Sequence, residues 1–197
     1  MDRVLLWLVL LAPLAVQLFR YGDESIFYGE FLGWSGEQSA RLLLVTLAVS
    51  PLRAWLPSFA ALRWLARRRR DLGIATFVYA SAHAASYLQY KADWARIWKE
   101  AAEPGLWTGW IALVVFAVLA VTSNDASLRT LGRSWARLHR SVHLAAVLTF
   151  AHWILTAFDP TAGAIHAGVL ALLLLARIIP TAWRPRANRE KTADSPT

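Results

Sequence analysis

Residues 142–158 read VHLAAVLTFAHWILTAF, a run of apolar and small side chains without Asp, Glu, Lys or Arg. A segment of about 17–25 such residues is long enough for one helix to cross a lipid bilayer. The run also holds two histidines, His143 and His152. Because an ionisable side chain is costly in hydrocarbon, a histidine at this depth is expected to have a function. The stretch therefore predicts a membrane-spanning helix that carries a functional imidazole.

Five more segments have the same character. The chain has 197 residues, of which 57% are hydrophobic and 17% charged, whereas a soluble domain carries about 25% charge. We expect an all-α membrane protein with a six-helix transmembrane bundle over residues 1–182 and a short, polar, disordered cytoplasmic tail over residues 183–197. The six predicted spans are Val4–Leu18, Ser39–Leu56, Leu72–Tyr90, Leu106–Thr122, Val142–Phe158 and Gly163–Ile179.

The basic residues are concentrated in a few stretches between the predicted spans. Most of the 21 Lys and Arg residues fall in the stretches 53–70, 129–140 and 177–191. These stretches share one side of the membrane if successive spans alternate in direction. Since basic loops stay on the cytoplasmic side, both termini are expected in the cytoplasm. The net charge of +8 therefore reflects membrane topology and not nucleic-acid binding.

His83 and His152 are expected at the same depth in the membrane. Each lies 12 residues after the predicted cytoplasmic start of its helix, near Asp71 and Arg140 respectively, which corresponds to about 18 Å. Both helices run outward, so the two imidazoles can clamp a haem iron between them. The chain has no cysteine, which excludes Fe–S clusters and covalent haem attachment. The pair predicts a non-covalent b-type haem in an electron-carrying protein.

A second group of candidate residues lies at the cytoplasmic rim. His139 stands 13 residues before His152, and its counterpart on the third predicted span is Arg69. We expect Arg69 near a second haem or a flavin, because guanidinium binds carboxylate and phosphate. Thirteen residues turn about 220° beyond full turns, so a bend, a π-bulge or a tilted approach is needed if His139 and His152 both face inward. His143 is an alternative inner ligand, and His166 is expected to be structural.

Four stretches resemble the MsrQ (YedZ) family of haem-binding membrane proteins, which belongs to the ferric-reductase-like transmembrane group. The last stretch is the most specific, with its Leu-Gly-x-x-Trp-x-x-Leu-His motif and a second histidine 13 residues later. The stretches are residues 39–52 (SARLLLVTLAVSPL), 69–87 (RRDLGIATFVYASAHAASY), 120–124 (AVTSN) and 131–153 (LGRSWARLHRSVHLAAVLTFAHW).

The resemblance implies a protein of the bacterial inner membrane that crosses it several times. Such proteins pass electrons from the quinone pool, or from a flavin donor, to a periplasmic molybdopterin methionine sulfoxide reductase that repairs oxidised proteins. The resemblance places the metal ligands on His83, His139 and His152 and also implies an association with FMN, although no flavin motif is visible. His143 departs from the family pattern.

Two other functions stay open at this point. A minimal transmembrane ferric or superoxide-forming reductase is disfavoured, because the 15-residue tail is too short for a flavin- and nicotinamide-binding domain. A small transporter or haem-handling protein favours broken helices and a repeated fold, neither of which is clear in the sequence. For the electron-transfer function, the partner is expected to dock on two outer loops rich in aromatic side chains, residues 21–37 and 91–103.

Overall fold

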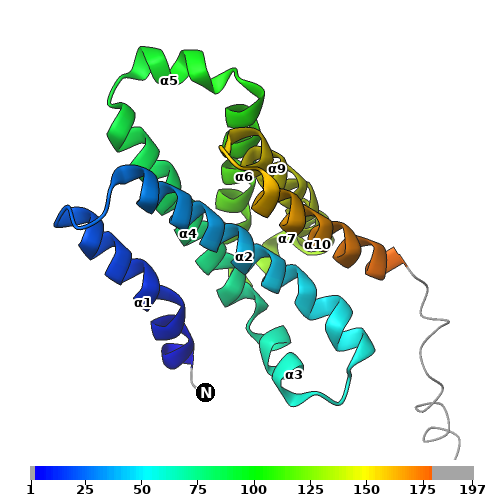
Figure 1. Ribbon diagram of the computed structural model, residues 1–197. Coiled ribbons are helices and arrows are strands. Elements are labelled where there is room, and N and C mark those ends of the chain that lie inside the picture. The colour runs from blue at the N-terminus through cyan, green and yellow to red at the C-terminus, as the bar shows by residue number, and fades with distance from the viewer. Residues whose placement is uncertain (1–2, 179–197) are drawn as a thin grey trace, which may run out of the picture.

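The computed structural model describes residues 3–178, and this part of the chain forms ten helices. The predicted tail over residues 183–197 lies outside the described residues. Figure 1 shows α5 at one end of the bundle and α3 at the other. We call these the outer and the inner end. The helices are α1 (Arg3–Gly22), α2 (Tyr28–Trp55), α3 (Ala60–Arg67), α4 (Arg69–Lys91), α5 (Trp94–Ala101), α6 (Pro104–Val121), α7 (Asp125–Leu131), α8 (Arg133–Arg140), α9 (Val142–Thr156) and α10 (Thr161–Ile178).

Each of the six predicted spans coincides with one helix, namely α1, α2, α4, α6, α9 or α10. By length and apolar composition alone, α1 and α6 are the helices among the described residues that can cross a bilayer, and α10 is apolar but shorter. Helices α2 and α4 carry charged residues near their ends, and α9 has 15 residues. The all-α fold is confirmed, whereas the number of spans and the side on which each terminus lies stay predictions.

The predicted loops are largely helical, which corrects the sequence-based boundaries. Helix α2 begins at Tyr28, well before the predicted start at Ser39, and α5 fills most of the segment 91–103. Local caps start two of the short helices. The Asp93 carboxylate accepts hydrogen bonds from the first turn of α5, and the Asn124 side chain accepts one from α7. A search for long apolar runs misses such elements, because their signal is a single capping residue.

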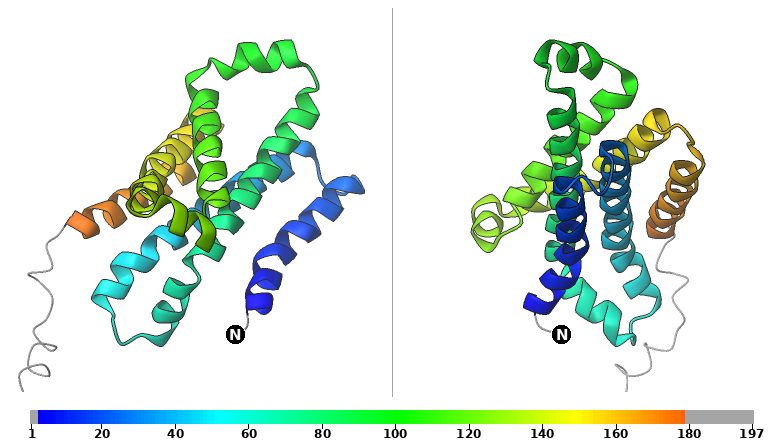
Figure 2. Two further views of the ribbon diagram at one scale, coloured as in Figure 1. Left: turned by 180° about the vertical axis from the view of Figure 1, so that it is seen from behind. Right: turned by 60° about the vertical axis from the view of Figure 1, so that its left-hand side comes forward.

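Two helix pairs make the frame of the bundle. Helix α2 packs along α4, and α6 packs along α9; these are the two most extensive helix contacts. The views in Figure 2 agree with Figure 1 that α1 and α10 lie on opposite flanks of α2. The main core lies between α2, α6, α9 and α10, where Leu43, Leu47 and Phe150 are almost completely buried. The frame thus includes α4 and α9, the helices that carry His83 and His152.

Polar contacts hold α4 in place from both sides. The buried Asp71 carboxylate accepts hydrogen bonds from Arg3 and from the Trp7 indole of α1, at 3.0 and 3.2 Å. The Tyr79 hydroxyl donates to the carbonyl of Leu10, also on α1. On the other side, the Ser39 hydroxyl of α2 donates to a backbone carbonyl of α4 at 3.0 Å. Buried polar groups paired in this way restrict how one helix can slide along another.

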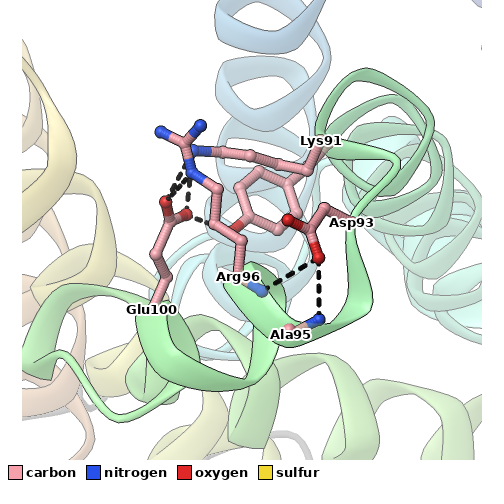
Figure 3. A network of polar contacts seen from close by, with 6 residues as sticks. Lys91, Asp93, Ala95, Arg96 and Glu100 are labelled. Atoms are coloured by element: carbon pink, nitrogen blue, oxygen red, sulfur yellow. Dashed lines mark hydrogen bonds and ion pairs between the residues drawn. The ribbon is translucent and has the colours of Figure 1, made fainter.

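At the outer end, a carboxylate ties α5 to α4. Glu100 on α5 accepts hydrogen bonds from Tyr87, Lys91 and Arg96, with distances of 2.7–2.9 Å (Figure 3). These contacts lower the pKa of the Glu100 carboxyl to about 2, with the Lys91 contact the strongest cause. The short helix is therefore attached to α4 through Glu100, while Ile97 is its buried apolar residue.

A helix break separates His139 from His152. Helix α8 ends at Arg140 and α9 begins at Val142, with Ser141 between them. Ser141 has φ −61° and ψ −12°, which departs from regular α-helix geometry mainly in ψ. The 13-residue spacing from His139 to His152 therefore spans one interruption of the helix, at Ser141.

Candidate functional site

The structure brings the rings of His83 of α4 and His152 of α9 close together. Their ring centres are 6.0 Å apart and the ring planes are nearly perpendicular, at 88°. Their common depth in a membrane and their role as ligands stay predictions.

Each of these rings is anchored by the backbone of a neighbouring helix. The Nδ1–H of His83 donates to the carbonyl of Leu32 on α2 at 2.9 Å, and the Nδ1–H of His152 donates to the carbonyl of Gly105 on α6 at 2.6 Å. A hydrogen bond at one ring nitrogen selects the tautomer and orients the other nitrogen. In both residues Nε2 is thus the nitrogen left to bind a metal.

The space between the rings fits one iron atom. An imidazole nitrogen lies about 1.1 Å from the ring centre, since ring C–N bonds are about 1.33 Å long. A metal–imidazole bond is about 2.0 Å. Two rings that share one metal ion therefore have centres about 6.2 Å apart, close to the observed 6.0 Å. The residues present fit bis-histidine ligation of a haem.

Two glycines make the close approach of these rings possible. A Cβ atom on Gly36 of α2 would lie 2.8 Å from Nδ1 of His83, and one on Gly109 of α6 would lie 2.7 Å from Nδ1 of His152. Each glycine follows the accepting carbonyl, of Leu32 or of Gly105, by four residues. The same local geometry therefore occurs twice, once in the α2–α4 pair and once in the α6–α9 pair.

A cavity of about 500 Å³ surrounds the two histidines. This volume lies within the range of about 300–1,000 Å³ typical of cofactor and ligand sites. Its walls come from α2, α4, α6 and α9 and are mostly apolar. Among the residues that line it are Gly33, Gly36, His83, Tyr87, Gly109 and His152. The arrangement gives a mostly apolar cavity that holds two imidazole rings.

Sequence reasoning found the two histidines but missed the glycines that receive them. The signal was present as glycines spaced by four residues, Gly29 and Gly33 on α2 and Gly105 and Gly109 on α6. Such spacing marks a helix face that a neighbouring group can approach closely. Only Gly36 and Gly109 face a histidine ring, which required the tertiary structure.

His139 lies at the inner end, in surroundings different from those expected. Its Nε2 lies 3.1 Å from the Thr122 hydroxyl at the end of α6, and its ring stacks on Trp135 with centres 3.9 Å apart. Burial and the nearby charge of Arg70 lower the pKa of the His139 imidazole. The neutral, metal-binding form is thereby favoured. The arginine that approaches His139 is Arg70, whose guanidinium lies 5.7 Å from the Trp135 ring.

Arg69, the arginine predicted beside His139, points elsewhere. Its guanidinium donates to the Ser50 hydroxyl of α2 at 2.6 Å. His143 also has partners of its own, since its Nδ1–H donates to the carbonyl of Arg140 and its Nε2 accepts from Arg177 of α10. The structure thus brings His83 and His152 together, but it separates Arg69 from His139 and engages His143 with Arg177.

His166 makes only local contacts among the described residues. Its Nδ1–H donates to the carbonyl of Ala162 in the same helix at 2.7 Å. Its ring lies 5.0 Å from the ring of Trp153. These contacts agree with the structural role expected for it.

Comparison with known proteins assigns the chain to a family. Residues 35–150 match the family described as ferric reductase like transmembrane component. This range includes most of α2, all of α4 and α6, and most of α9, and thus most of the helix frame. It ends two residues before His152. No solved structure matches the chain significantly.

Relatives cover most of the chain. The protein-methionine-sulfoxide reductase heme-binding subunit MsrQ of Xanthomonas campestris (strain B100) is 36% identical over 81% of this chain and 71% of its own length. The Rhodospirillum rubrum protein of the same description is 38% identical over 78% of this chain and 74% of its own length. That of Xanthomonas axonopodis (strain 306) is 33% identical over 93% and 86%. The chain therefore belongs to the MsrQ family, within the ferric-reductase-like transmembrane proteins.

Proposed function

We propose that this protein is the haem-binding, electron-transferring membrane subunit of a methionine sulfoxide reductase system. The observation that carries the proposal is the approach of His83 and His152, with ring centres 6.0 Å apart inside a cavity of about 500 Å³. The names of the relatives, which describe heme-binding subunits of such a reductase, support it. Two histidine ligands leave no open iron position, which favours electron transfer over oxygen chemistry.

The chain's own residues hold and insulate the haem b. His83 and His152 supply one imidazole nitrogen each, and the carbonyls of Leu32 and Gly105 keep those imidazoles oriented. When bound, the haem accepts and releases one electron at a time. The apolar walls of the cavity exclude water from this centre. A dry shell of this kind is one of the means by which a protein sets a haem potential.

The proposed membrane arrangement follows the charge pattern of the sequence. Helices α1, α2, α4, α6, α9 and α10 cross the bacterial inner membrane, with both termini in the cytoplasm. The outer end, with α5, then faces the periplasm, where a molybdopterin-containing reductase subunit docks. The inner end faces the cytoplasm and receives electrons from quinol or from a flavin donor.

A second cofactor at the inner end completes the proposal. His139, neutral and stacked on Trp135, is the metal ligand available there. Arg70 lies over the Trp135 ring and supplies positive charge for haem propionates or for the phosphate of FMN. Arg69, whose guanidinium is directed to Ser50, adds positive charge at the same level without contacting this cofactor. A cofactor at this level would divide the crossing into two shorter electron steps.

The decisive experiment is a reduced-minus-oxidised absorbance spectrum of the purified protein and of three variants. His83→Ala and His152→Ala should each abolish the low-spin signal of the outer haem, because either change removes one axial ligand. His166→Ala is the matched control and should keep that signal, since His166 bonds within its own helix. Full low-spin haem in both ligand variants would refute the assignment.

A further inference from the structure

Two arginines from different helices meet on one face of α2 at the inner end. Arg69 of α4 donates from Nη1 to the Ser50 hydroxyl at 2.6 Å. Arg177 of α10 donates from Nη2 to the carbonyl of Leu47 at 3.0 Å. Leu47 and Ser50 are three residues apart, so they are neighbours on the helix surface. The guanidinium groups of Arg69 and Arg177 are therefore held side by side.

The hydrogen-bonding capacity of this arginine pair is not used up. The Nε atoms of Arg69 and Arg177 are buried without a hydrogen-bond partner among the described residues. A buried donor on a charged group is costly to leave unsatisfied, because the group loses its hydration without gaining a partner. Natural structures rarely leave such groups unpaired, so the two donors point to a missing acceptor.

The pair also lacks a counter-charge in the part of the chain that the structure describes. The ion pairs found there involve Arg3, Arg41, Arg70, Lys91 and Arg96, and neither Arg69 nor Arg177. His143 accepts a hydrogen bond from Arg177 and donates from Nδ1 to a backbone carbonyl, which makes it a neutral neighbour. Two adjacent positive charges without a carboxylate partner indicate a bound anion that bridges them.

The exposed side of α10 is apolar up to the level of Arg177. It carries Leu172 and Leu175, with exposed fractions of 67% and 57%, on the side of the helix that is turned away from the Arg177 contact with α2. A ligand with an anionic head and hydrocarbon chains matches this combination of charge and apolar surface.

We propose that Arg69 and Arg177 bind the phosphate of an anionic phospholipid whose acyl chains lie along α10. Basic sites between helices at the cytoplasmic level of a membrane bind anionic head groups in this way. The same chemistry would accept free phosphate, which the test below distinguishes. The site is separate from His139, whose contacts come from α6 and α8. The proposal does not depend on haem binding.

The test measures thermal unfolding of the haem-loaded protein in detergent with added phosphatidylglycerol, phosphatidylcholine or inorganic phosphate. Phosphatidylglycerol at about a hundred times its Kd should raise the Tm by about 5–10 °C, and phosphatidylcholine should not. Arg177→Gln should abolish this shift. Arg53→Gln is the matched control, because Arg53 is an exposed arginine of α2 at the same end. It should keep the full shift.

The outcomes separate this proposal from the proposed function. The absorbance of the outer haem should be the same in Arg177→Gln as in the wild type, so loss of the lipid shift is read independently of haem binding. An equal shift with inorganic phosphate would overturn the lipid as ligand. Equal shifts with both phospholipids, or an undiminished shift in Arg177→Gln, would overturn the site itself. Removal of residues 183–197 should leave the shift unchanged; a shift that appears only after removal would mean that tail carboxylates occupy the arginine pair.

Discussion

The outer and the inner level of the bundle hold their histidines by different means. At the outer level, backbone carbonyls of α2 and α6 orient His83 and His152, and glycines leave room for both rings. At the inner level, side chains orient the histidine, since His139 is hydrogen-bonded to the Thr122 hydroxyl and stacks on the Trp135 ring. Backbone groups of packed helices move less than side chains. The outer level is therefore a prearranged site, whereas the inner level can change its contacts when a ligand binds.

The strongest test of this difference is to fill the space beside the histidine rings at the outer level. Gly36→Ala and Gly109→Ala each place a methyl group less than 3 Å from a histidine ring. Overpacking costs about 1–3 kcal/mol, so haem affinity should fall by about 10- to 100-fold. Haem titration of the purified protein measures the change, and the low-spin spectrum of the remaining haem should shift.

Gly33→Ala is the control for these two substitutions. Gly33 lines the same cavity on the same helix, but a Cβ atom there would contact nothing within 4 Å. Its haem affinity should stay within about twofold of wild type. If Gly33→Ala and Gly36→Ala weaken haem binding equally, the glycines act through α2 as a whole and not through the histidine ring.

A second prediction concerns the inner level. His139→Ala should remove part of the total cofactor, leave the outer haem spectrum intact and block electron uptake from quinol or a flavin donor. Arg69→Ala should have a weaker effect of the same kind, and Arg68→Ala little effect. Because Arg70 lies over the Trp135 ring, we expect the effect of Arg70→Ala to resemble that of Arg69→Ala. Cofactor content and the rate of haem reduction by quinol measure these effects.

The opposite result at the inner level would also be informative. One haem per chain in the wild type, with unchanged electron uptake in His139→Ala, would show that the inner residues serve topology alone. The outer level would then carry the entire redox function.

A third prediction tests whether the two ends face different partners. At the outer end, α5 exposes Trp94 and Trp98, with exposed fractions of 71% and 80%. Exposed aromatic residues are enriched at the cores of protein interfaces. Replacing both with Ala should slow electron transfer to the reductase subunit about tenfold, which is a loss of about 1.4 kcal/mol, without changing haem content. Trp55→Ala, an exposed tryptophan at the inner end, should leave that rate unchanged.

The smallest expected effect concerns the charge that holds α5 over the outer end. The contacts with Lys91, Arg96 and Tyr87 lower the pKa of Glu100 to about 2 from an ordinary 4.5. This attachment is therefore complete above about pH 4.5 and is lost progressively as the pH falls towards 2. The protection factors of residues 94–101 against hydrogen exchange, calculated against the intrinsic exchange rate at each pH, should fall over that range in the wild type. Glu100→Gln should show lower protection factors already at neutral pH and little further change with acid.

The long apolar runs alone predicted the helices that form the bundle, because burial in hydrocarbon or in a helix core requires the same residues. The short helices α3, α5, α7 and α8 were not predicted. A single capping side chain starts α5 and α7, and α3 and α8 have no side-chain cap that could mark their start. The break at Ser141 was anticipated as a bend from the spacing of His139 and His152, but its position was not.

The sequence by itself determined the family and the common depth of His83 and His152, because depth depends only on the rise per residue from a charged boundary. Rotation around each helix axis depends on side-chain packing, so only the tertiary structure decided what each residue faces. It set Gly36 and Gly109 against the histidine rings and directed Arg70 towards His139. It also brought Arg69 beside Arg177, 108 positions away in the chain, onto one turn of α2. No local sequence pattern predicts that these two arginines lie together, since their proximity arises from the packing of three helices.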